Sequence, residues 1–578
     1  MERGTVLLDF DGVAPGSLAF TGPRRVVEAR ALADVGPALA AVEAECAAGR
    51  WAAGFLAYEA APALDPALRI RAPGAGPLAW FGIYDGPVPA LTPGERGEDA
   101  ALGPLAPDVT RTAYLRAVQR IRARIGRGDL YQVNHTLRLR GPFRGDPLAL
   151  YLRLRAAQGS GLAALVHLGD RAVVSASPEL FLERRGELVS ARPMKGTARR
   201  GRFEEEDLAA AAALVASEKE RAENVMIADL LRNDLGRVAT LGSVRVARLF
   251  EVERYRTVHQ LTSTIEARLR PGVGLAALLA ATFPCGSVTG APKAMAMRVI
   301  AEEEEAPRGA YCGAIGFVAP GGDAAFNVAI RTVELDLATG EAVAGVGGGI
   351  TWASDPEREW EEALAKSAFL AEPSAPFELV ETLRLERGCY PLRARHLARL
   401  GASARHLGFA LDPAQVDRAL GREVEAAAGS ARRIRLLVAA SGAVRTETAP
   451  LPAPARAPLP VALATARVSR DDPTLFHKTT RRAVYDAARA ERPDAFDVLL
   501  ANEQGELTEF TIGNLVLDLD GAQVTPPREA GLLAGVMRAE LLARGELRER
   551  PVRVDDLARA RALWLVNAVR GRVPVRLA

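Results

Sequence analysis

The chain has 578 residues, which is too long for one hydrophobic core and predicts several folding units. Its 49% hydrophobic and 25% charged content are typical of a globular protein, and the net charge of +3 is small beside 74 basic and 71 acidic side chains. Composition therefore gives no electrostatic reason to expect nucleic acid or a membrane as partner.

Cysteine usage and the opening residues bear on the compartment. The four cysteines are scattered without a C-x-x-C pair, which favours a reduced compartment over a disulfide framework or a zinc site. The start, MERGTVLLDF, lacks the apolar core and cleavage signal of a signal peptide, and no run approaches 18 apolar residues. We therefore expect a cytoplasmic enzyme.

The pattern of the first 200 residues predicts short strands and helices, and a carboxyl and an amine lie at the ends of two of the strands. Short β-like runs alternate with a helix at about 37–49, and a second helix is predicted over 108–126 with Asp108 as its N-cap. In the strand YQVNHTLRLRG, Gln132 and Asn134 share one face, which is either a pocket wall or a satisfied polar face. Glu179 in SPELF and Lys195 in RPMKGT lie at the ends of consecutive strands and could share one pocket.

Lysine is scarce here, which makes each lysine informative. Only five of the 74 basic residues are lysine: Lys195, Lys219, Lys293, Lys366 and Lys478. An amine can lose its proton and attack carbon, whereas a guanidinium stays charged and planar. A neutral lysine near pH 7 needs a pKa about 3 units below its usual value, a cost of about 4 kcal/mol, so the pocket must be dry or flanked by cations.

Two further helices carry carboxylates at helical spacing. A long helix is predicted over 204–238, with Glu220 and Glu223 three residues apart. In the helix predicted over 355–371, Glu359, Glu362 and Lys366 lie on one face. With Glu223, these carboxylates either hold Mg²⁺ through oxygen ligands or form a surface salt-bridge ladder.

The periodic pattern breaks at 371–376, which we interpret as a linker between a domain at 1–370 and one at 377–578. The second domain is predicted to contain a strand pair around 377–390, helices at 393–408 and 413–428, and a strand at RIRLLVAA. A proline-rich segment at 449–460 is expected to join two lobes.

Eight motifs give residues 1–370 a resemblance to the chorismate-utilising enzymes, and among them to component I of aminodeoxychorismate synthase. In order, they are SPELF, RPMKGT, ENVMIADLLRNDLG, GSVTGAPK, YCGAIG, AIRT, GVGGGI and EREWEEALAK. The resemblance implies a β-sandwich of antiparallel sheets with outer helices, and with the second domain an α+β chain. It implies chorismate and ammonia as substrates and Mg²⁺ as cofactor.

The resemblance also assigns roles to residues of the first domain. Lys195 matches the nucleophile that adds to the chorismate ring, where the similar anthranilate synthase motif has alanine, and Glu179 matches the general acid/base. Glu223, Glu359 and Glu362 match the Mg²⁺ site. Gln132 stands where isochorismate and salicylate synthases have a water-activating lysine, which argues against hydration of the ring. Groups expected at the substrate are Gln132, Gln260, Thr289, Tyr311, Arg331, Gly348, Gly349 and Lys366.

The chain departs from the family pattern at one position. Where relatives often have histidine in an H-L-V-S pattern, this chain has Gln260, with His259 beside it. Either Gln260 polarises the leaving hydroxyl by hydrogen bonding or His259 takes that role, and the sequence leaves both open.

Residues 377–578 resemble class IV pyridoxal-phosphate enzymes, most closely aminodeoxychorismate lyase. The motifs are HLARL, HKTTRR, EFTIGN, AGVMR and VNAVRG. The resemblance implies a two-lobed fold with Lys478 as the cofactor lysine and base, Glu509 at the pyridine nitrogen, and Arg399, Val536 and Met537 at the phosphate. The first strands of stand-alone class IV enzymes are missing before FELVETL, which leaves the substrate of this half open.

Together the halves predict a bifunctional enzyme of 4-aminobenzoate synthesis. No G-x-C-x-G elbow surrounds any cysteine, so we expect ammonia from a separate glutamine amidotransferase subunit. A homodimer through the second domain is a further expectation. The alternatives are an anthranilate synthase-like half fused to a class IV aminotransferase, and a catalytically idle partner of a glutaminase.

Overall fold

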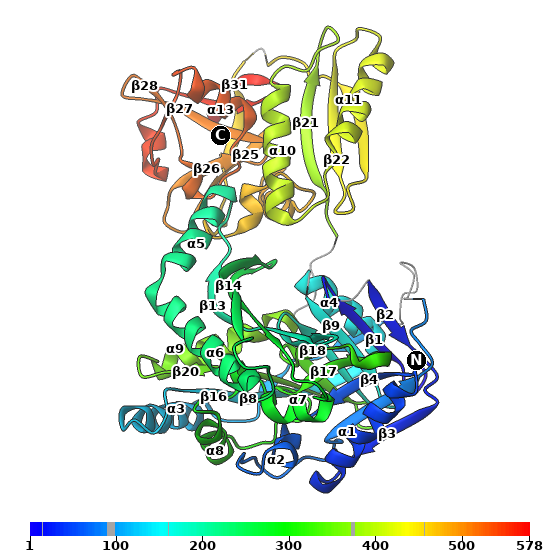
Figure 1. Cartoon of the computed structure of the whole chain (residues 1–578). Helices are drawn as coiled ribbons and strands as arrows, with labels where there is room; N and C mark the ends of the chain where they lie inside the picture. The colour runs from blue at the N-terminus through cyan, green and yellow to red at the C-terminus, as the bar shows by residue number, and fades with distance from the viewer. Residues whose placement is uncertain (14–15, 90–98, 160, 371–375, 456) are drawn as a thin grey trace. The chain divides into compact units, whose positions relative to one another are not determined.

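The computed structural model describes residues 1–13, 16–89, 99–159, 161–370, 376–455 and 457–578. The chain divides into two compact units, and each is described by itself (Figure 1). The N-terminal unit comprises Met1–Arg199 and Ala211–Ser374, and the C-terminal unit comprises Arg200–Ala210 and Ala375–Ala578. The linker predicted at 371–376 lies outside the described residues except for residue 376.

Two ten-stranded antiparallel sheets form the described part of the N-terminal unit. The first runs in the order β16 (Gly290–Ala291), β8 (Gln132–Gly145), β20 (Glu341–Ile350), β19 (Thr332–Asp336), β10 (Arg171–Ser177), β9 (Leu162–His167), β1 (Val6–Phe10) and β2 (Ser17–Phe20), with β6 (Ala100–Leu102) and β7 (Ala106–Pro107) also on β8. The second runs in the order β13 (Met194–Arg199), β15 (Val258–Arg268), β12 (Leu188–Arg192), β11 (Leu180–Arg185), β18 (Ala324–Val328), β17 (Ala314–Val318), β4 (Trp51–Leu56), β5 (Ala79–Tyr84) and β3 (Arg25–Ala29), with β14 (Arg245–Arg254) on β15.

The two sheets share a hydrophobic core. Leu8 and Phe20 of the first sheet belong to one buried cluster with Phe55, Trp80 and Phe317 of the second. Successive residues of a strand face opposite sides, so the intervening Leu7 joins a second cluster that also contains helical residues. This arrangement confirms the sandwich of antiparallel sheets with outer helices.

The helices of the N-terminal unit differ from the sequence prediction in their ends. The α-helices are α1 (Leu32–Ala47), α2 (Ala61–Leu64), α3 (Arg111–Gly126), α4 (Pro147–Gln158), α6 (Glu218–Gly236), α7 (Leu275–Thr282), α8 (Lys293–Glu303) and α9 (Pro356–Ala365). A further helix, α5 (Glu204–Ala216), begins in the residues of the C-terminal unit and ends in those of the N-terminal unit. Short 3₁₀ helices are η1 (Tyr58–Ala60), η2 (Gly286–Val288), η3 (Pro320–Gly322) and η4 (Lys366–Leu370). The first helix thus begins at Leu32 and continues through Pro37, and the helix predicted over 355–371 becomes 3₁₀ from Lys366.

Two helix predictions were wrong at their caps. Asp108 does not cap α3, because the hydroxyl of Thr110 accepts from the amide of Ala113 at 3.2 Å, while the Asp108 carboxylate accepts from the amide of Arg138 at 3.1 Å. The helix predicted over 204–238 is two helices, because Ser217 leaves the helical conformation and caps α6.

The described C-terminal unit contains two sheets, in agreement with two lobes. One is antiparallel, in the order β21 (Leu379–Leu385), β22 (Arg432–Val438) and β23 (Val444–Pro450), and packs against α10 (Arg393–Leu407) and α11 (Pro413–Ala427). The other runs in the order β26 (Leu507–Phe510), β25 (Asp497–Ala501), β24 (Leu459–Leu463), β31 (Gly571–Leu577), β30 (Ala562–Asn567), β27 (Gly513–Leu519), β28 (Ala522–Thr525) and β29 (Arg548–Glu549). Its helices are α12 (Ala483–Glu491), α13 (Val536–Ala543), η5 (Pro473–Phe476), η6 (Arg528–Ala530) and η7 (Val554–Ala558).

The strand pair predicted around 377–390 was half right. β21 is present, but the return segment is a turn in which only Glu386 and Cys389 pair. Across the described residues, no helix has both the length and the apolar content that crossing a lipid bilayer requires.

Candidate active sites

The Lys195 amine and the Glu179 carboxyl lie within electrostatic reach of each other in the N-terminal unit. Glu179 stands between β10 and β11, is 3% exposed, and its Oε1 has no hydrogen-bond partner among the described residues. Burial raises the pKa of Glu179 to about 7, against the opposing effects of Ser287 and Lys195. Burial lowers the pKa of Lys195, against the opposing charge of Glu179. Both directions favour a neutral acid beside a neutral amine.

The backbone of Lys195 is held by a buried amide. Asn224 of α6 donates through Nδ2 to the carbonyl of Lys195 at 3.2 Å and to that of Leu261 at 3.1 Å. The hydroxyl of Ser263 donates to Asn224 Oδ1 at 2.5 Å. A single side chain therefore ties β13 to β15 at the lysine, and the sequence analysis gave Asn224 no role.

The glycine run of β20 leaves room for functional side chains. A Cβ at Gly349 would lie 2.0 Å from Gln132 Nε2 and 3.5 Å from Lys195 Nζ. A Cβ at Gly348 would lie 3.2 Å from Glu359 Oε2 and 3.4 Å from Lys366 Nζ. Glycine at both positions thus lets main chain approach these groups, as expected for a strand that binds a ligand through its backbone.

Carboxylates from α6 and α9 interact electrostatically with one another. Lys366 Nζ lies 2.9 Å from Glu362 Oε1 and donates to the carbonyl of Gly347 at 2.9 Å. Burial raises the pKa of Glu359, and the neighbouring Glu362 adds to this effect. Glu223 and Glu362 both raise the pKa of Glu220, which burial already raises. Glu220 is a fourth carboxylate, and only its spacing from Glu223 signalled it in the sequence.

These carboxylates fit Mg²⁺ by donor type. Within the described ranges, no group of three His, Cys, Asp or Glu side chains is close enough to hold a metal ion by itself. Mg²⁺ is usually bound through one or two carboxylates, with waters and substrate oxygens completing the shell, so a complete protein cage is not required. Burial and neighbouring carboxylates raise the pKa of Glu220 and Glu359, whereas, although burial opposes it, Lys366 lowers the pKa of Glu362. A cation stabilises such a crowded donor set.

Arg331 is a partly buried cation without an acidic partner among the described residues. Its backbone is left-handed, with φ of 51°, and its Nη1 donates to Gln158 Oε1. Burial lowers its pKa. The amide Nε2 of Gln158, in turn, has no partner among the described residues. Such a guanidinium suits a carboxylate ligand, and the sequence gave no signal for Gln158.

The remaining predicted groups lie on several segments of the N-terminal unit. Thr289 is fully buried and follows η2, and its hydroxyl donates to the carbonyl of Cys285 at 3.2 Å. The ring of Tyr311 lies 5.1 Å from the guanidinium of Arg138. Gln260 Oε1 accepts from the hydroxyl of Thr197, two residues after Lys195, at 3.1 Å. His259 directly precedes Gln260 on β15, and the side chains of consecutive strand residues point to opposite faces of the sheet.

In the C-terminal unit the groups predicted to hold pyridoxal phosphate influence one another. Burial, Arg399 and Arg482 lower the pKa of Lys478 to about 8, against Glu381 and Glu509. Burial raises the pKa of Glu509 to about 7. Its Oε1 accepts from the hydroxyl of Tyr485 at 2.8 Å and from the amide of Leu533 at 3.0 Å. A carboxyl near neutrality is poised to share a proton with a ring nitrogen.

Arg399 is oriented by a buried carboxylate that the sequence analysis missed. Glu381 of β21 accepts from Arg399 Nε at 2.9 Å and Nη2 at 2.7 Å, and it lies 2.7 Å from His396 Nδ1. Although burial acts in the opposite direction, Arg399 and His396 lower the pKa of Glu381 to about 2. His396 Nε2 is buried without a partner among the described residues.

The start of α13 supplies backbone donors. Val536 and Met537 are its first residues, and Gly535 is the N-cap without a capping side chain, so the first amides stay available to an anion. A Cβ at Gly535 would lie 1.8 Å from Asn514 Oδ1, which restricts the position to glycine. A poised amine, a near-neutral acid, an oriented arginine and free amides together fit pyridoxal phosphate.

Comparison with known proteins agrees with this division. Residues 14–372 match the family model described as chorismate binding enzyme, and residues 378–578 match amino-transferase class IV. The chain belongs to the chorismate binding enzyme family. It carries in addition a class IV aminotransferase domain, a family that depends on pyridoxal phosphate.

Individual relatives cover only parts of the chain. An aminodeoxychorismate synthase of Streptomyces pristinaespiralis is 44% identical over 256 residues, which are 44% of this chain and 35% of that protein. Anthranilate synthase component 1 of Streptomyces coelicolor is 42% identical over 305 residues, 53% of this chain and 57% of that protein. The chain thus spans between a third and about half of these relatives.

A solved structure gives the same fold for the N-terminal unit. Anthranilate synthase component I from Streptococcus pneumoniae superimposes with a TM-score of 0.54 at 26% identity, covering 64% of this chain and 92% of that one. The relatives include both aminodeoxychorismate and anthranilate synthases at nearly equal identity, so the choice between their products rests on individual residues.

The lowered pKa of Lys478 predicts how the apoprotein takes up pyridoxal phosphate. Only a neutral amine attacks an aldehyde, so covalent uptake should accelerate as pH rises to about 8 and then level off. Stopped-flow absorbance of the lysine-bound cofactor measures the rate. K478R is the control without covalent uptake, and a midpoint near the ordinary lysine pKa would contradict the expectation.

Proposed function

We propose that this chain makes 4-aminobenzoate from chorismate in two consecutive reactions, with residues 1–370 as the aminating domain and residues 377–578 as the lyase domain. The observation that carries the proposal is Lys195, an amine whose pKa burial lowers, beside Glu179, a carboxyl whose pKa burial raises. Anthranilate synthases resemble this motif with alanine at the lysine position. Lys195 therefore favours amination at C4 of the ring over amination at C2.

In the first reaction Lys195 is the nucleophile. Its neutral Nζ forms a bond to ring carbon C2 while the C4–O bond breaks, and Glu179 gives its proton to the departing hydroxyl, which leaves as water. Ammonia then forms the new bond at C4, and Nζ leaves C2 with its electron pair. The sum is chorismate plus ammonia giving 4-amino-4-deoxychorismate and water.

The residues around this pair have supporting roles. Arg331 binds one carboxylate of chorismate, a role supported by its partly buried guanidinium, which donates to Gln158 and has no acidic partner among the described residues. Gly348, Gly349, Lys366, Thr289, Tyr311 and Gln132 hold the rest of the substrate. Gln260, joined to Thr197 on the Lys195 strand, is better supported than His259 as the group that polarises the leaving hydroxyl.

Glu223, Glu359 and Glu362 would hold Mg²⁺, with Glu220 close to them in charge interactions. A bound Mg²⁺ would supply positive charge to the ring carboxylate of chorismate and to these carboxylates. Lys366 Nζ lies 2.9 Å from Glu362 Oε1 of the same group.

In the second reaction the C-terminal unit releases pyruvate. Bound pyridoxal phosphate supplies an electron sink for the ring carbon that carries nitrogen. Lys478 takes the proton from C4, the C3–O bond breaks, and the enolpyruvyl group leaves with a proton to become pyruvate as the ring aromatises. Glu509 holds the proton at the cofactor's ring nitrogen, and Arg399 with the α13 amides binds its phosphate.

A separate glutamine amidotransferase subunit is the proposed source of ammonia, because no cysteine of this chain lies in a G-x-C-x-G elbow. The class IV match is also compatible with an aminotransferase. The pairing of the two domains favours the lyase, since it would consume the product of the first.

Replacing Lys195 tests the first reaction. K195R keeps charge and length but cannot supply a neutral amine, so ammonia-dependent formation of 4-amino-4-deoxychorismate should fall by about two orders of magnitude. Chromatography of products from chorismate, Mg²⁺ and ammonium gives the measurement. An unchanged rate sinks the nucleophile assignment, and 2-aminobenzoate as the wild-type product supports the anthranilate alternative.

Replacing Lys478 tests the coupling of the halves. With K478R, chorismate and ammonium should give 4-amino-4-deoxychorismate that accumulates, whereas the wild type should release pyruvate and 4-aminobenzoate in equal amounts. Pyruvate is measured with a coupled dehydrogenase assay. Equal pyruvate release by K478R would remove Lys478 from the reaction.

The source of nitrogen is tested with the pure chain. Ammonium should support turnover and glutamine alone should not, because the glutaminase is expected on another subunit. Chorismate consumption followed by absorbance distinguishes the two. Full turnover with glutamine would disprove the need for a partner.

A further inference from the structure

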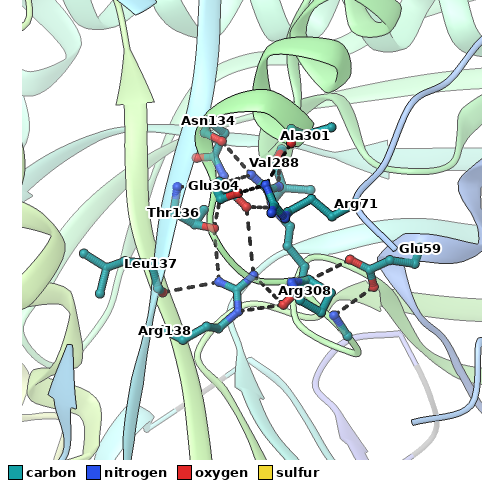
Figure 2. Close-up of polar contacts among 12 residues, drawn as sticks. Glu59, Arg71, Asn134, Thr136, Leu137, Arg138, Val288, Ala301, Glu304 and Arg308 are labelled. Carbon is teal, nitrogen blue, oxygen red and sulfur yellow. Dashed lines mark hydrogen bonds and ion pairs between the residues drawn. The ribbon is translucent and has the colours of Figure 1, made fainter. Parts of the chain in front are cut away.

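An ion pair between Glu304 and Arg308 is buried in the N-terminal unit and contacts Asn134 and Val288 (Figure 2). Arg308 is 2% exposed and Glu304 is 4% exposed. The guanidinium donates through Nε to Glu304 Oε2 at 3.0 Å and through Nη2 to Glu304 Oε1 at 2.6 Å. Desolvation offsets most of the attraction in such a pair, so net stability alone is a weak reason for its presence.

The outer nitrogens of Arg308 join two pocket segments. Nη1 donates to the carbonyl of Val288 at 2.6 Å, and Nη2 donates to the carbonyl of Asn134 at 2.7 Å, as Figure 2 shows. Val288 immediately precedes Thr289, and Asn134 is two residues beyond Gln132 on β8. The amide of Asn134 also donates to the carbonyl of Thr289 at 2.8 Å. One guanidinium thus fixes the distance between the Gln132 strand and the Thr289 turn.

The other half of the pair anchors the same strand. Glu304 Oε1 accepts from the amide of Thr136 at 2.8 Å and from its hydroxyl at 2.9 Å. Gln132, Asn134 and Thr136 alternate along β8, so the pair holds the strand at two successive positions beyond Gln132. The carboxylate also balances the guanidinium's charge, which burial would otherwise make costly.

A third segment follows directly from Arg308 in the chain. The amides of Arg308 and Gly309 donate to the Glu59 carboxylate at 2.6 Å and 2.9 Å. This clamp fixes the turn that leads to Tyr311, whose ring lies 5.1 Å from the Arg138 guanidinium. Arg138 Nη1 donates in turn to the Thr136 hydroxyl at 3.1 Å. The network therefore spans the segments of Gln132, Thr289 and Tyr311.

We infer that the Glu304–Arg308 pair is a positioning device that sets the spacing of Gln132, Thr289 and Tyr311 for chorismate. We propose no contact between either residue and the substrate. Both act through the backbone of the segments that carry Gln132, Thr289 and Tyr311. The inference rests on the proposed function of this site. Arginine is required because its planar fork reaches a carboxylate and two carbonyls at once, which the single ammonium of lysine cannot do.

The test is R308K in the full-length holoenzyme, assayed for ammonia-dependent amination. Loss of the Val288 and Asn134 tethers should raise KM for chorismate by about tenfold, with a smaller change in kcat, because ground-state and transition-state binding weaken together. Pyruvate release from supplied 4-amino-4-deoxychorismate by the C-terminal unit should stay unchanged, and it serves as a control within the same chain.

R71K is the matched control from the same network. Arg71 donates to the carbonyls of Ala301 at 3.1 Å and Glu304 at 2.5 Å, at the C-terminal end of α8, and within the described part of the chain it makes no hydrogen bond to β8 or the 286–289 turn. Its KM should equal that of the wild type. V42A, in the core of α1, controls for general loss of thermal stability.

E304Q provides a second route if R308K does not fold. It keeps an acceptor for Thr136 but removes the charge, and KM should rise as in R308K. A KM within twofold of the wild type in a folded R308K or E304Q overturns the inference, as does an equal rise in V42A.

Calorimetric binding of chorismate to the wild type is measured first. Absence of that binding would sink the proposed function, whereas equal binding by wild type and R308K would sink only the positioning role.

Discussion

Removal of an amine from water is the constraint on which the N-terminal unit depends. A lysine that must attack carbon near neutral pH gives up about 1.4 kcal/mol for each unit by which its pKa falls. Burial of Lys195 and Glu179 in one place supplies that shift and moves the carboxyl in the complementary direction, to about 7 for Glu179. Under the proposed function, Lys195 is the nucleophile and Glu179 is the acid. Asn224 ties β13 to β15 at Lys195, and the β20 glycines leave room for its amine.

The C-terminal unit meets the same requirement by a different balance. Lys478 is surrounded by two arginines, Arg399 and Arg482, whose positive charge adds to burial in lowering its pKa to about 8. Glu381 restrains that field by neutralising Arg399 through two hydrogen bonds. The arrangement avoids an unpaired cation in the interior. The proposed phosphate binding by Arg399 and the reactivity of the Lys478 amine therefore depend on the same three charges.

The features that could be predicted from the sequence are those that depend on local residue patterns. Alternating strands, the sandwich with outer helices and the order of the two family domains follow from motifs of four to fourteen residues. Helix caps were less predictable. Asp108 and Thr110 are both favourable N-cap residues and lie two residues apart. Thr110 caps the helix, because the Asp108 carboxylate instead accepts from the amide of Arg138, which is distant in sequence. Partners distant in sequence left no signal. Gln158 contacts Arg331, and Arg308 reaches Asn134, across more than 170 residues, and these pairs arise only when separate strands meet.

The surroundings of the five lysines show where the scarcity of lysine pointed to a specific local environment and where it did not. Lys195 and Lys478 have lowered pKa values and are suited to bonding with carbon. The ammonium of Lys293 lies between Asp234 Oδ2 at 2.7 Å and the Thr282 carbonyl at 2.8 Å. The ammonium of Lys366 lies between the Glu362 carboxylate and the Gly347 carbonyl. Only the side chain of Lys219 is largely exposed, at 69%. Two distinct physical features thus distinguish four of the five lysines. One is an amine with a lowered pKa, and the other is a compact ammonium that contacts a carboxylate and a carbonyl at once.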